Sequence, residues 1–128
     1  MFLEKNKILS GALFFLISIE IFWFSSLPGV GIGNGGSRPS RIYHFTIFFL
    51  FAFFLFNLIK TKNTIKQKEI YLTLIIAIIY AFTDEFHQLF INGRSASIKD
   101  VLTDTIGIFS AIIIHLKVYL KEKIKRDA

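Results

Sequence analysis

Residues 70–90 read IYLTLIIAIIYAFTDEFHQLF, and this stretch decides the fold. It is apolar from Ile70 to Phe82 and then continues through Thr83-Asp84-Glu85-Phe86-His87-Gln88 to Phe90. A run of about 20 mainly apolar residues is long enough to cross a bilayer as a helix. The stretch therefore predicts a membrane-spanning helix with a polar group near its C-terminal end.

Three further apolar runs, at about residues 8–27, 42–59 and 98–120, accompany this helix. Hydrophobic residues make up 53% of the 128 residues, and 16 of them are Phe. We therefore expect one all-α domain, residues 1–128, that forms a four-transmembrane-helix bundle. This composition excludes an ordinary soluble enzyme. The absence of Cys excludes a disulfide scaffold, a thiolate zinc site and a Cys nucleophile.

The positions of the basic residues predict the orientation of the bundle. Eleven of the 15 lie before the first span, between the second and third, or after the fourth: Lys5, Lys7, Lys60, Lys62, Lys66, Lys68 and five from Lys117 onward. By the positive-inside rule, both N- and C-termini are then cytoplasmic. We expect a multi-pass protein of the cytoplasmic (plasma) membrane, with the lipid bilayer as its partner and no nucleic acid.

Polar side chains gather in a single layer at the outward half of the spans. At about 1.5 Å rise per residue, the group that starts at Asp84 lies roughly 21–26 Å above Ile70. The other spans place polar residues at the same depth. The layer contains Glu20, Arg41, His44, Asp84, Glu85, His87, Gln88, Arg94, Asp100 and Asp104. Because a charge in lipid is costly unless it is paired, protonated or hydrated, such a layer indicates a functional site.

Local patterns add expectations about packing. Asp84, His87 and Gln88 are spaced i, i+3 and i+4 and so share a helix face. Gly107-x-x-x-Ala111 predicts close approach of a neighbouring helix. Ser97 with Asp100 predicts a capping box at the start of the fourth span, and Asn92-Gly93 a tight turn before it.

Outside the polar layer the expectations are structural. We expect the aromatic run from Phe45 to Phe56 to face lipid, and His115 with the basic tail to anchor the helix at the interface. Glu20 is expected to be a buried acid, either protonated or paired with an arginine.

The quoted motifs resemble those of the VanZ-like membrane protein family. The likeness lies in Asp84-Glu85-Phe86-His87-Gln88, then Gly93-Arg94-Ser95, then Asp100-Val101-Leu102 and Gly107. Arg41-x-x-His44 resembles the opening of the family's second span, although Lys is commoner there, and Asn is common where this chain has Asp104. The resemblance implies a small polytopic protein of the cell envelope. It also implies a link to low-level resistance to the glycopeptide teicoplanin.

The residues of the layer supply the candidate site. Candidates for acid–base catalysis are Asp84, Glu85, His87 and His44, although the sequence leaves open whether the protein is an enzyme. We expect Arg94 to pair with Asp84 or Asp100 at rest and to bridge to a ligand. The expected ligand-binding residues are Arg41, His44, Asp84, Glu85, His87, Gln88, Arg94 and Asp100. No fixed metal-ligand spacing joins His44, Asp84, His87 and Asp100, so neither a metal nor another cofactor is predicted.

Three functions fit these residues. The first is an outward-facing polar pocket that binds an anionic lipid or a lipid-linked cell-wall ligand through Arg41, Arg94 and the histidines. The second is a membrane-embedded hydrolase or transferase that acts on an outer-leaflet phospholipid or a polyprenyl phosphate. The third is a subunit of an ion- or proton-coupled transporter, which would need a homo-oligomer because four spans are few for one chain.

Overall fold

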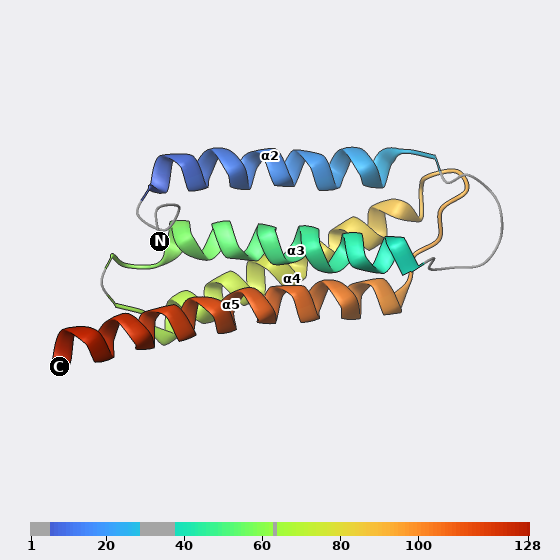
Figure 1. The fold of residues 1–128 in the computed structure, drawn as a ribbon. Helices are drawn as coiled ribbons and strands as arrows, with labels where there is room; N and C mark the ends of the chain where they lie inside the picture. Colours follow the sequence, from blue (N-terminus) through green and yellow to red (C-terminus); the bar gives the residue numbers. More distant parts are fainter. Residues whose placement is uncertain (1–5, 29–37, 63) are drawn as a thin grey trace.

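Four long helices make up the described part of the chain, which comprises residues 6–28, 38–62 and 64–128 of a computed structural model. They are α2 (Lys7–Ser26), α3 (Arg38–Ile59), α4 (Gln67–Gln88) and α5 (Ile98–Asp127). Each contains a segment that is long and apolar enough to cross a membrane. Figure 1 shows the four helices side by side, with the start of α2 and the end of α5 at the same end of the bundle. The predicted all-α four-helix fold is confirmed.

Helices α3 and α5 extend beyond the apolar runs that predicted them, whereas α2 and α4 end one and two residues before the predicted ends at 27 and 90. The shortest, α2, has 20 residues, which at about 1.5 Å per residue matches a hydrocarbon core about 30 Å thick. Helix α3 begins at Arg38 rather than near residue 42, and α5 continues to Asp127 rather than ending near residue 120. The tail of α5 is exposed and rich in Lys, with one Glu and one Arg, all of which are good helix formers. Hydropathy therefore marks the apolar part of a helix, not the residues where the helix ends.

Helix α3 forms the core of the bundle, so the expectation that its aromatic run faces lipid was wrong. Phe48, Phe51 and Phe56 are among the largest fully buried side chains. The ring of Phe51 stacks on Tyr80 of α4 and also contacts Phe14 of α2. A run that is apolar on every face is expected of a helix surrounded by other helices as well as of one surrounded by lipid. The sequence pattern alone does not distinguish the two.

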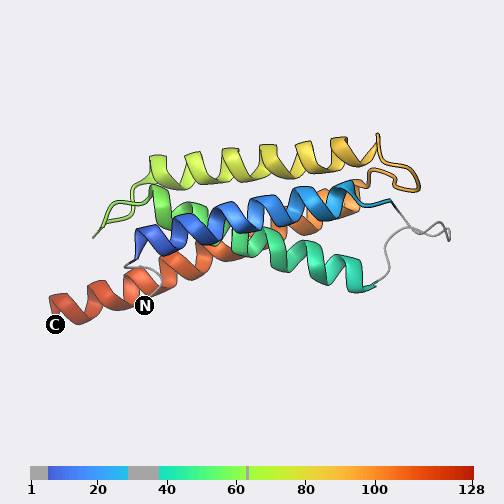
Figure 2. The same cartoon turned by 90° about the horizontal axis from the view of Figure 1, so that it is seen from above.

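Gly107 allows α3 and α5 to come into backbone contact, as the small-residue pattern predicted. A Cβ atom at this position would lie 2.5 Å from the carbonyl oxygen of Phe45 and 3.1 Å from the backbone nitrogen of Phe49. Figure 2 shows the two helices crossing at an angle. This contact fixes the rotation of α5 against α3 and therefore determines which side chains of α5 reach the site.

The end of the bundle opposite the site also contains buried polar groups. His115, expected at the interface, is instead buried: its Nε2 lies 3.1 Å from the carbonyl oxygen of Phe53, and its ring stacks on that phenyl ring. Asn57 of α3 donates a hydrogen bond to Ser10 of α2. Lys7 donates to the carbonyl oxygens of Leu58 and Lys60. These bonds tie α2, α3 and α5 together at that end.

Candidate functional site

A cavity of about 190 Å³ lies at the end of the bundle where α2 and α4 end and α3 begins. Four of its lining residues belong to the predicted ligand-binding set, namely His44, Asp84, Gln88 and Arg94. The remaining lining residues are Ile21, Phe24, Ser25, Tyr43, Ile47 and Phe48. The hydroxyl of Tyr43 is buried and has no hydrogen-bond partner in the described part of the chain. The cavity thus combines apolar walls with a few polar groups, as small-molecule sites do.

Arg94 reaches the cavity from the loop between α4 and α5. The turn before it contains Gly93 with a φ of 75°, which confirms the predicted tight turn because this backbone region favours glycine. Its Nε donates to the carbonyl oxygen of Leu27 at 3.0 Å, and its Nη2 to that of Phe24 at 2.7 Å. Within the described residues, Arg94 makes no ion pair with Asp84 or Asp100, so the expected resting pair is not formed. Carbonyl groups at the C-terminal end of α2 hold the guanidinium instead, as the helix dipole favours.

His44 lies between two aspartates of α5. Its Nδ1 is 2.8 Å from Oδ1 of Asp104, and its Nε2 is 4.0 Å from Oδ2 of Asp100. His44 and Asp104 are buried, with exposed fractions of 6% and 0%. The four-residue spacing of Asp100 and Asp104 puts both on the helix face that meets α3. The pair at 2.8 Å fixes the orientation of the imidazole, which also lines the cavity.

Glu85 connects α4 to the start of α5. Its Oε2 accepts a hydrogen bond of 2.8 Å from the backbone N–H of Ser97, the N-cap residue of α5. The predicted capping box assigned this role to Asp100, and the Ser97 side chain makes no cap hydrogen bond. Ser97 is therefore at the predicted cap position, but the carboxylate that satisfies its N–H comes from another helix. Asp100 remains directed to His44.

Asp84 and Gln88 line the cavity from α4. The Gln88 side-chain amide donates to Oδ2 of Asp84 and to Oε1 of Glu85, each at 3.4 Å. Ser25 of α2 donates to the backbone oxygen of Asp84 at 3.4 Å. Asp84, Glu85 and Gln88 are all buried, so α4 directs three polar side chains into the bundle near its end.

The remaining predicted site residues lie outside the cavity. His87 stacks on Phe22, and its Nε2 is 3.0 Å from the hydroxyl oxygen of Ser26. Arg41 is exposed at the start of α3. Glu20 was expected to be buried and is instead exposed on α2. Glu85 and Asp100 do not line the cavity but lie near His44: a Glu85 carboxylate oxygen is within 4.8 Å of a ring nitrogen, and Asp100 Oδ2 is 4.0 Å from Nε2.

Besides Ser25 and the apolar lining residues, Asp104 and Tyr43 were absent from the predicted ligand-binding set. Asp104 was seen in the polar layer, but only its contact with His44 reveals its part in the site. Tyr43 had no sequence signal beyond its position next to His44. Both become recognisable only when α3 and α5 are placed against each other.

The fold and the cavity define a small four-helix membrane protein with a buried polar site at one end. The VanZ/LLP1 family matches the chain over residues 5–120, and the chain belongs to this family. No curated protein and no solved structure matched the chain. The family assignment confirms the resemblance carried by the motifs of α4 and the loop after it.

Proposed function

We propose that the cavity binds the phosphate group of an anionic lipid or of a lipid-linked cell-wall intermediate, at the outer half of the cytoplasmic membrane. The observation that carries this proposal is the position of Arg94, which lines the cavity with no carboxylate partner among the described residues. A guanidinium has five N–H donors in a planar fork that suits phosphate oxygens. Two of these N–H groups donate to the carbonyl oxygens of Leu27 and Phe24. The other three N–H groups can donate hydrogen bonds to a ligand.

Other groups of the cavity support an anionic ligand of this kind. The unpartnered hydroxyl of Tyr43 can donate to a phosphate oxygen, and His44 can donate from a ring nitrogen. A volume of about 190 Å³ suits a headgroup rather than a whole lipid. The cavity lies at one end of the bundle, so acyl or prenyl chains would remain in the bilayer beside the helices.

The same proposal offers a mechanism for the cell-envelope role that the family resemblance implies. If the bound group belongs to a lipid-linked cell-wall precursor, the protein would alter how much of that precursor is exposed at the surface. We propose this change as the physical basis of the teicoplanin-type resistance that the family resemblance implies.

Native mass spectrometry of purified protein in detergent tests the proposal. The probes are a phosphatidylglycerol, a polyprenyl phosphate and, as a zwitterionic reference, a phosphatidylcholine with the same chains as the phosphatidylglycerol. We expect the wild type to retain at least one of the two anionic lipids in preference to phosphatidylcholine. Arg94→Gln should lose about tenfold or more in affinity for that lipid, because a charge-assisted bidentate contact contributes about 1.5–3 kcal/mol.

Lys99→Gln is the matched control, since it removes one positive charge near the same end of the bundle from an exposed side chain. It should bind as the wild type does. Equal retention of all three lipids by the wild type, or equal losses in Arg94→Gln and Lys99→Gln, would contradict the proposal. In the second case the basic residues act only through general attraction to anionic lipid.

A second candidate function is supported by the contact between His44 and Asp104. A histidine oriented by a buried aspartate can accept a proton from water as the water attacks phosphorus, while Arg94 holds the phosphate. The P–O bond to the prenyl oxygen breaks in the same step, and the protonated imidazole can return the proton to that oxygen, so that polyprenol and inorganic phosphate leave. His87 is less suited to this role because it lies outside the cavity. Release of inorganic phosphate from the polyprenyl phosphate, lost in His44→Gln, would support hydrolysis. Binding without release in the wild type would favour the first function.

A further inference from the structure

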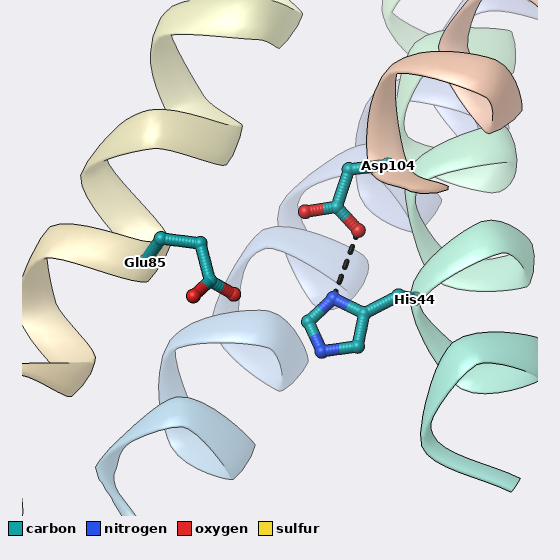
Figure 3. Close-up of side chains that lie close together, drawn as sticks. All are labelled: His44, Glu85 and Asp104. Atoms are coloured by element: carbon teal, nitrogen blue, oxygen red, sulfur yellow. Dashed lines mark hydrogen bonds and ion pairs between the residues drawn. The ribbon is translucent and has the colours of Figure 1, made fainter. Parts of the chain in front are cut away.

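Three ligating side chains from three different helices meet beside the cavity. They are His44 of α3, Glu85 of α4 and Asp104 of α5, and all three are buried. One potential ligand atom from each lies within 4.8 Å of the others. Figure 3 shows the imidazole and the two carboxylates facing a common centre. Ligand atoms around a tetrahedral Zn²⁺ ion are about 3.3 Å apart. Small side-chain rotations would bring the three ligand atoms from within 4.8 Å of one another to that separation.

A buried oxygen atom in this cluster has no hydrogen-bond partner. Oδ1 of Asp104 contacts His44, but Oδ2 is buried and unpartnered among the described residues. Asp104 has an exposed fraction of 0%. Burying a carboxylate oxygen without a partner destabilises the folded protein. A bound ion that contacts this oxygen would remove that cost. In Figure 3, one oxygen of Asp104 points to Nδ1 of His44 and the other toward the side of Glu85.

The charges around His44 are also unbalanced. Glu85, Asp100 and Asp104 place three carboxyl groups around one imidazole. In the residues that the structure describes, no lysine or arginine forms an ion pair with them, and Arg94, which lines the cavity, bonds carbonyl oxygens instead. A cation between the carboxylates would supply the missing positive charge without requiring the acids to be protonated.

From the cluster, the unpartnered oxygen and the charge excess, we infer that His44, Glu85 and Asp104 bind one divalent transition-metal ion. One imidazole nitrogen with two carboxylates is a donor set that suits Zn²⁺ or Mn²⁺. Asp100 completes the arrangement, because its carboxylate faces the other ring nitrogen of His44 at 4.0 Å. Metal-bound histidines almost always donate their second ring N–H to such a group, which fixes the ring.

This site differs from the four residues that were weighed as metal ligands in the sequence. No fixed metal-ligand spacing joins His44, Asp84, His87 and Asp100, and no metal was predicted. Of these four, only His44 belongs to the cluster described here, because Asp84 lines the cavity, His87 contacts Ser26 and Asp100 faces the second ring nitrogen of His44.

The inference does not depend on the proposed lipid binding, because metal binding is measured without lipid. It does bear on both candidate functions at His44: with one ring nitrogen bonded to a metal ion and the other N–H donated to Asp100, the imidazole neither accepts a proton from water nor donates to the phosphate, which is then held by Arg94 and Tyr43.

The test uses full-length protein in detergent, stripped of metal with a chelator, and isothermal titration with Zn²⁺ and with Mn²⁺ alone. We expect saturable binding of at least one of these ions at about one ion per chain. Glu85→Gln and Asp104→Asn should each weaken it about tenfold to a hundredfold, and Asp100→Asn by a similar or smaller factor. Glu20→Gln is the matched control, because it makes the same chemical change as Glu85→Gln on an exposed side chain of another helix. It should bind as the wild type does.

Three results would overturn the inference: no saturable binding to the wild type, wild-type affinity in both ligand variants, or an equal loss in Glu20→Gln. Where a variant does not fold, a Co²⁺ titration of the wild type decides instead. Visible absorption that appears with Co²⁺ and disappears when Zn²⁺ displaces it supports the site, and no such absorption refutes it. Arg94→Gln separates this inference from lipid binding, since it should lose the lipid and keep the metal.

Discussion

His44 is central to the site because two turns of one helix direct carboxylates at its two ring nitrogens. Asp104 contacts Nδ1 at 2.8 Å and is fully buried, whereas Asp100 stands 4.0 Å from Nε2 and is partly exposed. Interaction energy falls with distance and with hydration. The two aspartates should therefore contribute very unequally to holding the imidazole.

A double-mutant cycle on stability tests this inequality at the residue scale. In metal-free detergent solution, His44→Ala and Asp104→Ala should show a coupling energy of about 1–3 kcal/mol, the range of residues in direct contact. His44→Ala and Asp100→Ala should show less than about 1 kcal/mol, as expected of a more distant, hydrated pair. The measurement is thermal unfolding of single and double variants. Equal coupling energies for the two pairs would contradict the geometry described for His44.

The grouping of several polar residues at one end of the bundle was predictable from the sequence, but the partners of each residue were not. The rise of a helix is fixed, so residue counting along α3 and α4 groups His44 with Asp84 and Gln88, and all three line one cavity together with Arg94 of the following loop. Which of them meet depends on the rotation of each helix about its axis. Arg94 shows the limit most clearly: pairing with an acid was expected from charge, but the nearest acceptors are the backbone carbonyl oxygens at the end of α2.

At the element scale, the crossing of α3 and α5 fixes this rotation. Gly107 brings the two backbones into contact, and Asp104, three residues earlier, thereby reaches His44. The sequence predicted the close approach from the small-residue pattern. It assigned the wrong surroundings to α3, because an all-apolar helix has the same composition whether helices or lipid surround it.

Gly107→Ala tests the importance of this crossing. Its Cβ would meet the Phe45 carbonyl oxygen at 2.5 Å, so the helices must separate, and overpacking of this kind costs about 1–3 kcal/mol. Gly11→Ala is the control, because its Cβ would make only an ordinary contact, 3.7 Å from Leu58. It should be neutral or stabilising by up to about 1 kcal/mol through helix propensity. Thermal unfolding in detergent measures both, and similar effects at the two glycines would show that α3 and α5 are not in backbone contact.

At the scale of the whole molecule, the bundle has one end with the cavity and one end with most of the lysines. The start of α2 and the end of α5 lie together at the second end (Figure 1). The uneven distribution of basic residues predicts that this end is cytoplasmic and that the cavity opens outward. The account of lipid binding at the outer leaflet depends on that orientation.

Cysteine labelling measures the orientation directly, because the chain contains no Cys of its own. Ser95 and Thr64 are exposed in loops at opposite ends of the bundle. In intact cells, a membrane-impermeant maleimide should label Ser95→Cys, whereas Thr64→Cys should react only after the membrane is opened. The reverse pattern would put the cavity on the cytoplasmic side.

The central claim is that the Arg94 side chain holds a lipid phosphate in the cavity, and a nitrogen–phosphorus distance measurement tests it most directly. Solid-state NMR would use protein with ¹⁵N-labelled arginine in bilayers of whichever anionic lipid it retains in native mass spectrometry, and would detect dipolar coupling to ³¹P. We predict a coupled guanidinium whose N–H groups lie at hydrogen-bonding distance from phosphate oxygens, about 2.7–2.9 Å between nitrogen and oxygen. This signal should disappear in Arg94→Gln. A coupling that persists unchanged in that variant, or none in the wild type, would contradict the claim.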